Sequence, residues 1–106
     1  MTIEKSTDET LEKIISSDIP VLIKFQADWC QPCKNLTPIV EEISKEMKGQ
    51  VKFYYHDIES DPDGPVRYGP VMGIPHIIIF KNKEIIAQRT GSIPKGPLVS
   101  WIKENL

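Results

Sequence analysis

The segment 21–25, Val-Leu-Ile-Lys-Phe, limits the possible folds of this chain more than any other stretch. It is a short run of strand-forming residues, and both of its faces are apolar except at Lys24. A strand with this pattern belongs in the middle of a sheet that is covered on both sides. A second apolar run, residues 75–80, predicts another buried strand. We therefore expect a layered α/β structure.

Helical and extended patterns alternate along the rest of the chain. Ser6 and Glu9 form a capping-box pattern before a first helix that reaches Ile15. The other expected elements are a long helix from about 30 to 49, strands over 51–56 and 84–89, a short helix near 65–68 and a final helix over 98–106. The order (β)αβαβαββα predicts a mixed sheet with helices on both faces.

Length and charge limit the class of protein. At 106 residues the chain is expected to form one domain, 1–106, with a single core. A net charge of −2 gives no basic surface for nucleic acid. No apolar run approaches the ~20 residues that span a bilayer, so no membrane contact is expected. The N-terminal residues show no signal-peptide pattern, so a reducing, cytoplasmic location is the expectation.

The only two cysteines, Cys30 and Cys33, are separated by two residues. A disulfide that closes so small a ring stabilises the fold by roughly 2 kcal/mol, less than the ~3 kcal/mol of a 15-residue loop. The spacing therefore suits a bond that opens and closes. Zinc needs four ligands, and His56 and His76 do not have the spacing of a common zinc motif. Two inert buried thiols are a further alternative, which Pro32 at a helix start disfavours.

Cys30 is expected at the point where the strand 21–25 leads into the long helix. Free N–H groups and the positive end of the helix dipole would stabilise a thiolate there. Cys33 follows one turn later on the same face and is more shielded. We expect Cys30 to attack a substrate disulfide as the nucleophile, and Cys33 to resolve the mixed disulfide.

A series of residues in order and spacing resembles the thioredoxin family. The shared positions are Ala27 to Cys30, Pro32 to Lys34, Pro38, Tyr68-Gly69, Gly73 to Pro75, Phe80 to Asn82, and Gly91. The similarity covers the chain from about Asp18 to Leu106. It implies the thioredoxin fold, a central mixed four- to five-stranded sheet flanked by helices on both faces.

The resemblance also implies a function. The expected function is protein-disulfide reduction by a monomer, as part of electron transport and cell redox homeostasis. Such a reductase needs no bound cofactor or metal. Its partners would be disulfide-containing proteins as substrates and a flavin-dependent thioredoxin reductase as electron donor. Two alternatives stay open: a thiol oxidase or isomerase, which the reduction potential would distinguish, and a redox-silent binding subunit, which would lack cysteine-dependent activity.

The resemblance assigns further roles around the cysteines. The Ile74–Pro75 bond is expected to be cis and to shape the site, with the Ile74 backbone pairing with a substrate strand. Trp29 would shield one side of Cys30, and Gly91 would let a partner approach closely. Core packing of Trp29 and a simple turn at Gly91 are the alternatives.

Lys24 is the largest departure from the family pattern. The family has a buried Asp at this position, and the lysine that usually partners that Asp corresponds to Tyr55. Burial would favour a neutral amine at Lys24, which is able to take the proton of Cys33. Our hypothesis is that Lys24 handles this proton with an altered pH dependence. The alternative is that its stem packs in the core while its ammonium reaches water.

Three smaller departures border the same site. Gln31 replaces a glycine between the cysteines and, with Pro32, would adjoin the substrate; it adds no charge, so only a modest shift in redox potential is expected. Gln26 replaces a tryptophan, which removes a packing group near the site. His76 replaces a threonine directly after Pro75. It is a candidate substrate contact, although a solvated histidine at the strand start is the expected case.

Overall fold

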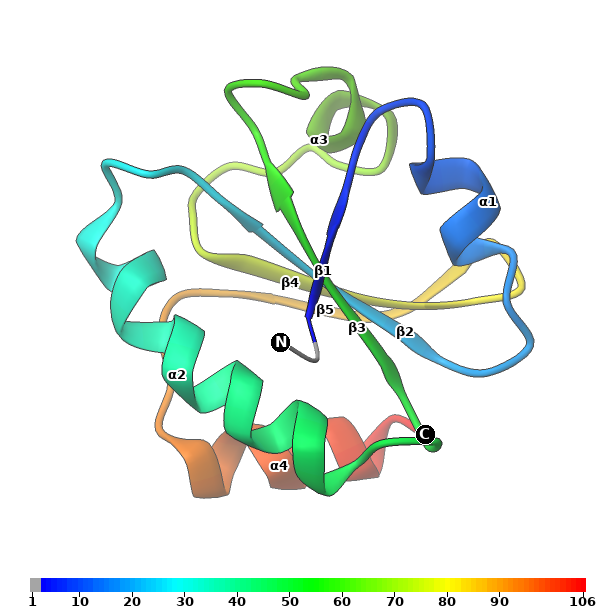
Figure 1. Cartoon of the computed structure of the whole chain (residues 1–106), viewed down its shortest axis with the longest axis vertical. Helices are drawn as coiled ribbons and strands as arrows, with labels where there is room; N and C mark the ends of the chain where they lie inside the picture. Colours follow the sequence, from blue (N-terminus) through cyan, green and yellow to red (C-terminus); the bar gives the residue numbers. More distant parts are fainter. Residues whose placement is uncertain (1–2) are drawn as a thin grey trace.

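The part of the chain that the structure describes contains five strands, which form one mixed sheet through the centre of the molecule (Figure 1). The computed structural model describes residues 3–106, so Met1 and Thr2 of the predicted domain 1–106 lie outside the described residues. The strands are β1 (Glu4–Ser6), β2 (Val21–Gln26), β3 (Lys52–Asp57), β4 (His76–Lys81) and β5 (Glu84–Thr90). Their order is β1-β3-β2-β4-β5. The pairs of β3 with β1 and β2 are parallel, and those of β4 with β2 and β5 are antiparallel.

Within residues 3–106, four helices cover the two faces of this sheet. They are α1 (Leu11–Ile15), α2 (Gln31–Glu46), α3 (Asp63–Arg67) and α4 (Lys95–Glu104). Figure 1 shows α2 and α4 together on one side of the strands, and α1 and α3 on the other. The predicted α/β class, the order of elements and the mixed sheet of four to five strands are confirmed, and the sheet of the described residues has five. No helix within residues 3–106 is both long and apolar enough to cross a membrane.

Strand β2 is the centre of the sheet and contributes to a separate core on each face. Leu22 packs into the core under α2 and α4. Val21, Ile23 and Phe25 pack into the core under α1. All four side chains are fully buried. The run that is apolar on both faces is therefore a strand with both faces covered, as its pattern predicts.

The capping box predicted at Ser6 and Glu9 does not form. Ser6 is the last residue of β1, and its hydroxyl lies 2.8 Å from Nδ1 of the buried His56. Helix α1 begins instead after Thr10, whose Oγ1 accepts the N–H of Thr7 at 2.9 Å. The prediction is wrong because pairing of β1 with β3 brings Ser6 opposite His56, where its hydroxyl is used.

Candidate active site

Cys30 and Cys33 form a disulfide at the beginning of α2. Cys30 is the N-cap residue, with extended backbone, and its sulfur accepts the N–H of Cys33 at 3.2 Å. Pro32 occupies the first turn, where its missing N–H removes no helical hydrogen bond. Both cysteines are nearly buried. The local geometry therefore directs the free N–H of Cys33 and the positive end of the helix dipole toward the sulfur that is expected to carry charge.

The loop before β4 brings Ile74 against this disulfide. Its carbonyl oxygen lies 3.8 Å from Sγ of Cys30, and the Ile74–Pro75 peptide bond is cis, as the resemblance implies. Gly91 follows β5 with a φ of +103°, and its N–H donates to the carbonyl of Pro75 at 2.8 Å. A Cβ built at Gly91 would meet no atom within 4 Å. The backbone conformation favours glycine there, and the space above it is open.

The residues next to the cysteines are exposed. Trp29 is 66% exposed, and its Nε1–H donates to Oε1 of Glu59 at 2.7 Å. Core packing of Trp29 is therefore wrong. Gln31 and Pro32 are also exposed, and the side-chain amide of Gln31 donates to Oδ1 of Asn35 at 2.9 Å. These side chains form an accessible rim around two shielded sulfurs.

Lys24 lies beneath the first turns of α2. It pairs with Tyr55 of β3 and Ile77 of β4, and only 3% of the residue is exposed. Its Nζ donates to the carbonyl oxygen of Cys33 at 3.2 Å and to Oγ1 of Thr37 at 2.6 Å. The alternative in which the ammonium extends into bulk water is therefore wrong. The position of Lys24 next to Cys33 agrees with the hypothesis, while its role in proton transfer stays a prediction.

His76 is buried, so the expectation of a solvated histidine is wrong. It is the first residue of β4, opposite Thr90 of β5. Its Nδ1 lies 2.7 Å from Oγ1 of Thr90, and its Nε2 lies 3.0 Å from Oε1 of Gln88. Pairing with β5 therefore supplies a polar partner for each ring nitrogen. A substrate contact by His76 stays a prediction.

The thioredoxin family model matches residues 2–104. The chain belongs to the thioredoxin family. It is 45% identical to a thioredoxin of Rickettsia felis over 101 residues, which are 94% of this chain and 95% of that protein. It is 38% identical to thioredoxin C-2 of Corynebacterium nephridii over 106 residues, 99% and 97% of the two chains. With its Cys30–Cys33 pair, this thioredoxin family member is a thiol–disulfide oxidoreductase, a protein-disulfide reductase.

A small cavity adjoins Lys24 on the side of α2. Its volume is about 210 Å³, and it is lined by Ile3, Lys24, Gln26, Asp28, Thr37, Val40, Glu41 and Tyr55. Burial lowers the pKa of Lys24 from 10.5 to about 8, and the Glu41 carboxylate partly opposes this shift. Gln26 thus lines a cavity with both polar and apolar walls in this thioredoxin family member, where the family pattern has a large packing group.

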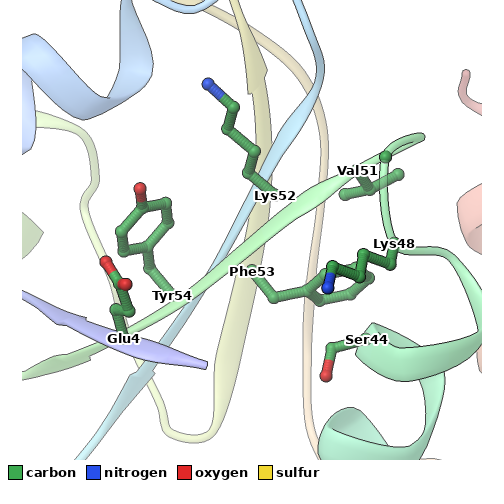
Figure 2. Close-up of a pocket in the computed structure, with 8 residues that line it drawn as sticks. Glu4, Ser44, Lys48, Val51, Lys52, Phe53 and Tyr54 are labelled. Carbon is green, nitrogen blue, oxygen red and sulfur yellow. The ribbon is translucent and has the colours of Figure 1, made fainter. Parts of the chain in front are cut away.

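A larger hollow lies at the opposite end of the sheet, where β3 begins. Its volume is about 400 Å³. Figure 2 shows Ser44 of α2 and Lys48 of the turn after it on one side, and Glu4 and Tyr54 on the other. Neither cysteine lines this hollow. Within residues 3–106, no group of three or more His, Cys, Asp or Glu side chains is arranged to hold a metal ion.

Sequence reasoning missed several partners of the site residues. The hydroxyl of Thr37 accepts a hydrogen bond from the amine of Lys24, and it donates one to the carbonyl oxygen of Cys33 at 3.1 Å. Its position four residues after Cys33 on a helix was a signal that could have identified it. Glu59 lies in an irregular segment after β3 and carried no such signal.

Proposed function

We propose that this thioredoxin family member reduces disulfides in other proteins, with Cys30 as the nucleophile and Cys33 as the resolving thiol. The Cys30 thiolate attacks one sulfur of the substrate disulfide. A Cys30–substrate bond forms, the substrate disulfide breaks, and the released substrate thiolate takes a proton from solvent. The N-cap position of Cys30 is the single observation that most supports this assignment.

In the second step, Cys33 loses its proton and attacks the Cys30 sulfur. The bond between Cys30 and the substrate breaks, the second substrate thiolate leaves, and the Cys30–Cys33 disulfide forms. This oxidised state is the one seen in the structure. Two electrons pass from the protein to the substrate, so a dithiol or flavin reductant must then restore the protein.

The proposed substrate is an extended protein segment that lies along the Ile74 backbone. Two observations support this docking mode. Ile74 presents its carbonyl next to the Cys30 sulfur, and the space above Gly91 is open. Trp29, Gln31 and the exposed Pro32 would border that segment.

The proposed electron donor is a thioredoxin reductase, a partner that membership of the family implies in general. The proposed setting is the cytoplasm, where the protein would act as a monomer in electron transport.

Insulin reduction with dithiothreitol as the final reductant tests the proposed roles. The wild-type protein should accelerate the reaction, and Cys30→Ser should abolish the acceleration. Cys33→Ser should stop after one step and accumulate a mixed disulfide, which mass spectrometry detects. Acceleration by Cys30→Ser equal to that of the wild type would contradict the proposal and favour a redox-silent binding subunit.

A further inference from the structure

The amine of Lys24 is held in a way that accommodates both of its protonation states. Its two hydrogen bonds, to Cys33 O and Thr37 Oγ1, use two N–H groups. A charged ammonium has three such donors, whereas a neutral amine has two donors and one lone pair. Lys24 is thus able to gain or lose one proton without breaking either bond.

The cavity next to Lys24 connects this amine to polar side chains. Thr37 and Glu41 come from α2, Asp28 from the turn before α2, and Tyr55 from β3. The titratable groups that face Lys24 are therefore Glu41, Asp28, Tyr55 and the cysteine pair itself. The remaining neighbours do not titrate; they are Ile3, Gln26, Thr37, Val40 and Ile77. At about 210 Å³ with several polar walls, the cavity has room for water.

We propose that Lys24 takes the proton of the Cys33 thiol during the resolving step and exchanges it with solvent through this cavity. This inference rests on the proposed function. A neutral amine and a thiol become an ammonium and a thiolate. The thiolate then forms the bond to Cys30, and the substrate thiolate leaves. When a reductant reopens the disulfide, the ammonium returns the proton to Cys33.

The acidity of the two groups suits this exchange. A free thiol has a pKa of about 8.5. Burial lowers the pKa of Lys24 to about 8, so neither direction of transfer is strongly uphill. An ordinary exposed lysine, with a pKa of 10.5, would hold its proton too tightly near neutral pH.

The test separates the two thiol steps by rapid mixing of the reduced protein with dithiobis(nitrobenzoate). Cys30 releases the first nitrothiolate, and Cys33 releases the second when it attacks Cys30. The rate of the second release in the wild type should rise with pH through an inflection near 8. Lys24→Met should move that inflection up to the pH at which the Cys33 thiol ionises unaided, and both Lys24→Met and Lys24→Arg should slow the second release at pH 7 at least ~10-fold relative to the first.

Arginine keeps the charge and the donors of Lys24 but does not titrate in this range. A wild-type profile in Lys24→Arg would therefore show that only a fixed charge is needed and would overturn the proposal. So would a wild-type profile in Lys24→Met. Lys45→Met, which removes an exposed lysine near the other end of α2, is the matched control and should behave like the wild type.

Thr37→Val gives a second measurement if the Lys24 variants do not fold. Loss of the Thr37 hydroxyl removes one acceptor of the ammonium, so the inflection should move below its wild-type position. An unmoved inflection would count against the proposal. Absence of any second release from the wild type would instead contradict the proposed function itself.

Discussion

The N–H of Gly91 donates a hydrogen bond to the carbonyl oxygen of Pro75, at 2.8 Å. This bond joins the end of β5 to the residue that precedes β4. It places the open space above Gly91 next to Ile74, and therefore next to the sulfur of Cys30. The edge that would bind a substrate is thus formed by the backbone just before β4 and the backbone just after β5.

Gly91→Ala should destabilise the protein and weaken its action on protein substrates. A φ of +103° is unfavourable for alanine, with a cost of about 1–2 kcal/mol in the free energy of unfolding. The added methyl would also occupy space left for a partner, so the KM for insulin should rise. Urea unfolding and insulin kinetics measure the two effects.

Gly96→Ala is the control for this change. Gly96 lies in α4, and a Cβ there also meets nothing within 4 Å, but its φ is not positive. Its replacement should leave insulin kinetics unchanged and stabilise the helix by up to about 1 kcal/mol. Equal effects of the two substitutions would show that the position of Gly91 has no special role.

Lys24→Met should stabilise the protein at neutral pH. The pKa of Lys24 is about 8 in the folded chain against 10.5 when unfolded, so its charged form is disfavoured by folding. This destabilisation is complete below pH 8 and disappears as pH rises from 8 to 10.5. We expect the variant to gain on the order of 2 kcal/mol at pH 7, reduced because two hydrogen bonds are lost.

Urea titrations of the wild type and Lys24→Met at pH 7 and at pH 10 measure this difference. The advantage of the variant should shrink at the higher pH, because the wild type no longer buries a charge. A gain that is independent of pH would show that packing, rather than the charge of Lys24, sets the difference. Lys45→Met again serves as the control.

His76→Leu should destabilise the protein by about 1 kcal/mol, because it removes the hydrogen bonds of a buried ring, whereas the exposed side chains of Thr90 and Gln88 are able to bond to water instead. A double-mutant cycle with Thr90→Val should give a coupling energy of about 1 kcal/mol. Unfolding of the four proteins in urea supplies the cycle. Additive effects of the two substitutions would contradict a direct bond between these side chains.

Asp61→Asn should lower stability at neutral pH and have less effect in acid. The Asp8 N–H donates to the Asp61 carboxylate at 2.8 Å and holds its pKa below the ordinary 3.8. The stabilisation from this carboxylate is present above 3.8 and is lost as pH falls through the lowered pKa. Acid unfolding of Asp61→Asn should therefore begin from a less stable protein and depend less steeply on pH. The exposed Asp18 offers a matched substitution, Asp18→Asn, which should not change the acid transition.

The sequence predicted the sheet well because its central strands carry a strong local pattern. Residues 21–25 are apolar on both faces except at Lys24, and such side chains are all buried only in a strand that is covered on both sides. The capping-box prediction is wrong because the hydroxyl of Ser6 bonds to a distant residue, His56 of β3, and not to the start of a helix. A local signature cannot report a contact between residues 50 positions apart.

The two site residues with unusual chemistry show the same limit. The resemblance to the family implied that Lys24 is buried near Cys33, but its hydrogen bonds depend on which turn of α2 lies above it. His76 was expected in solvent because one histidine after a proline carries no sign of its neighbours. Its burial is set by Gln88 and Thr90, which β5 brings into register.

The bond from the Cys33 N–H to the Cys30 sulfur has a consequence for the cost of opening the disulfide. The donor contacts that sulfur while the sulfur is still uncharged. When reduction leaves a negative charge on Cys30, no dipole has to turn to meet it. The backbone is therefore already arranged for the reduced state. A change between the two states moves electrons and protons, while the backbone around Cys30 stays nearly in place.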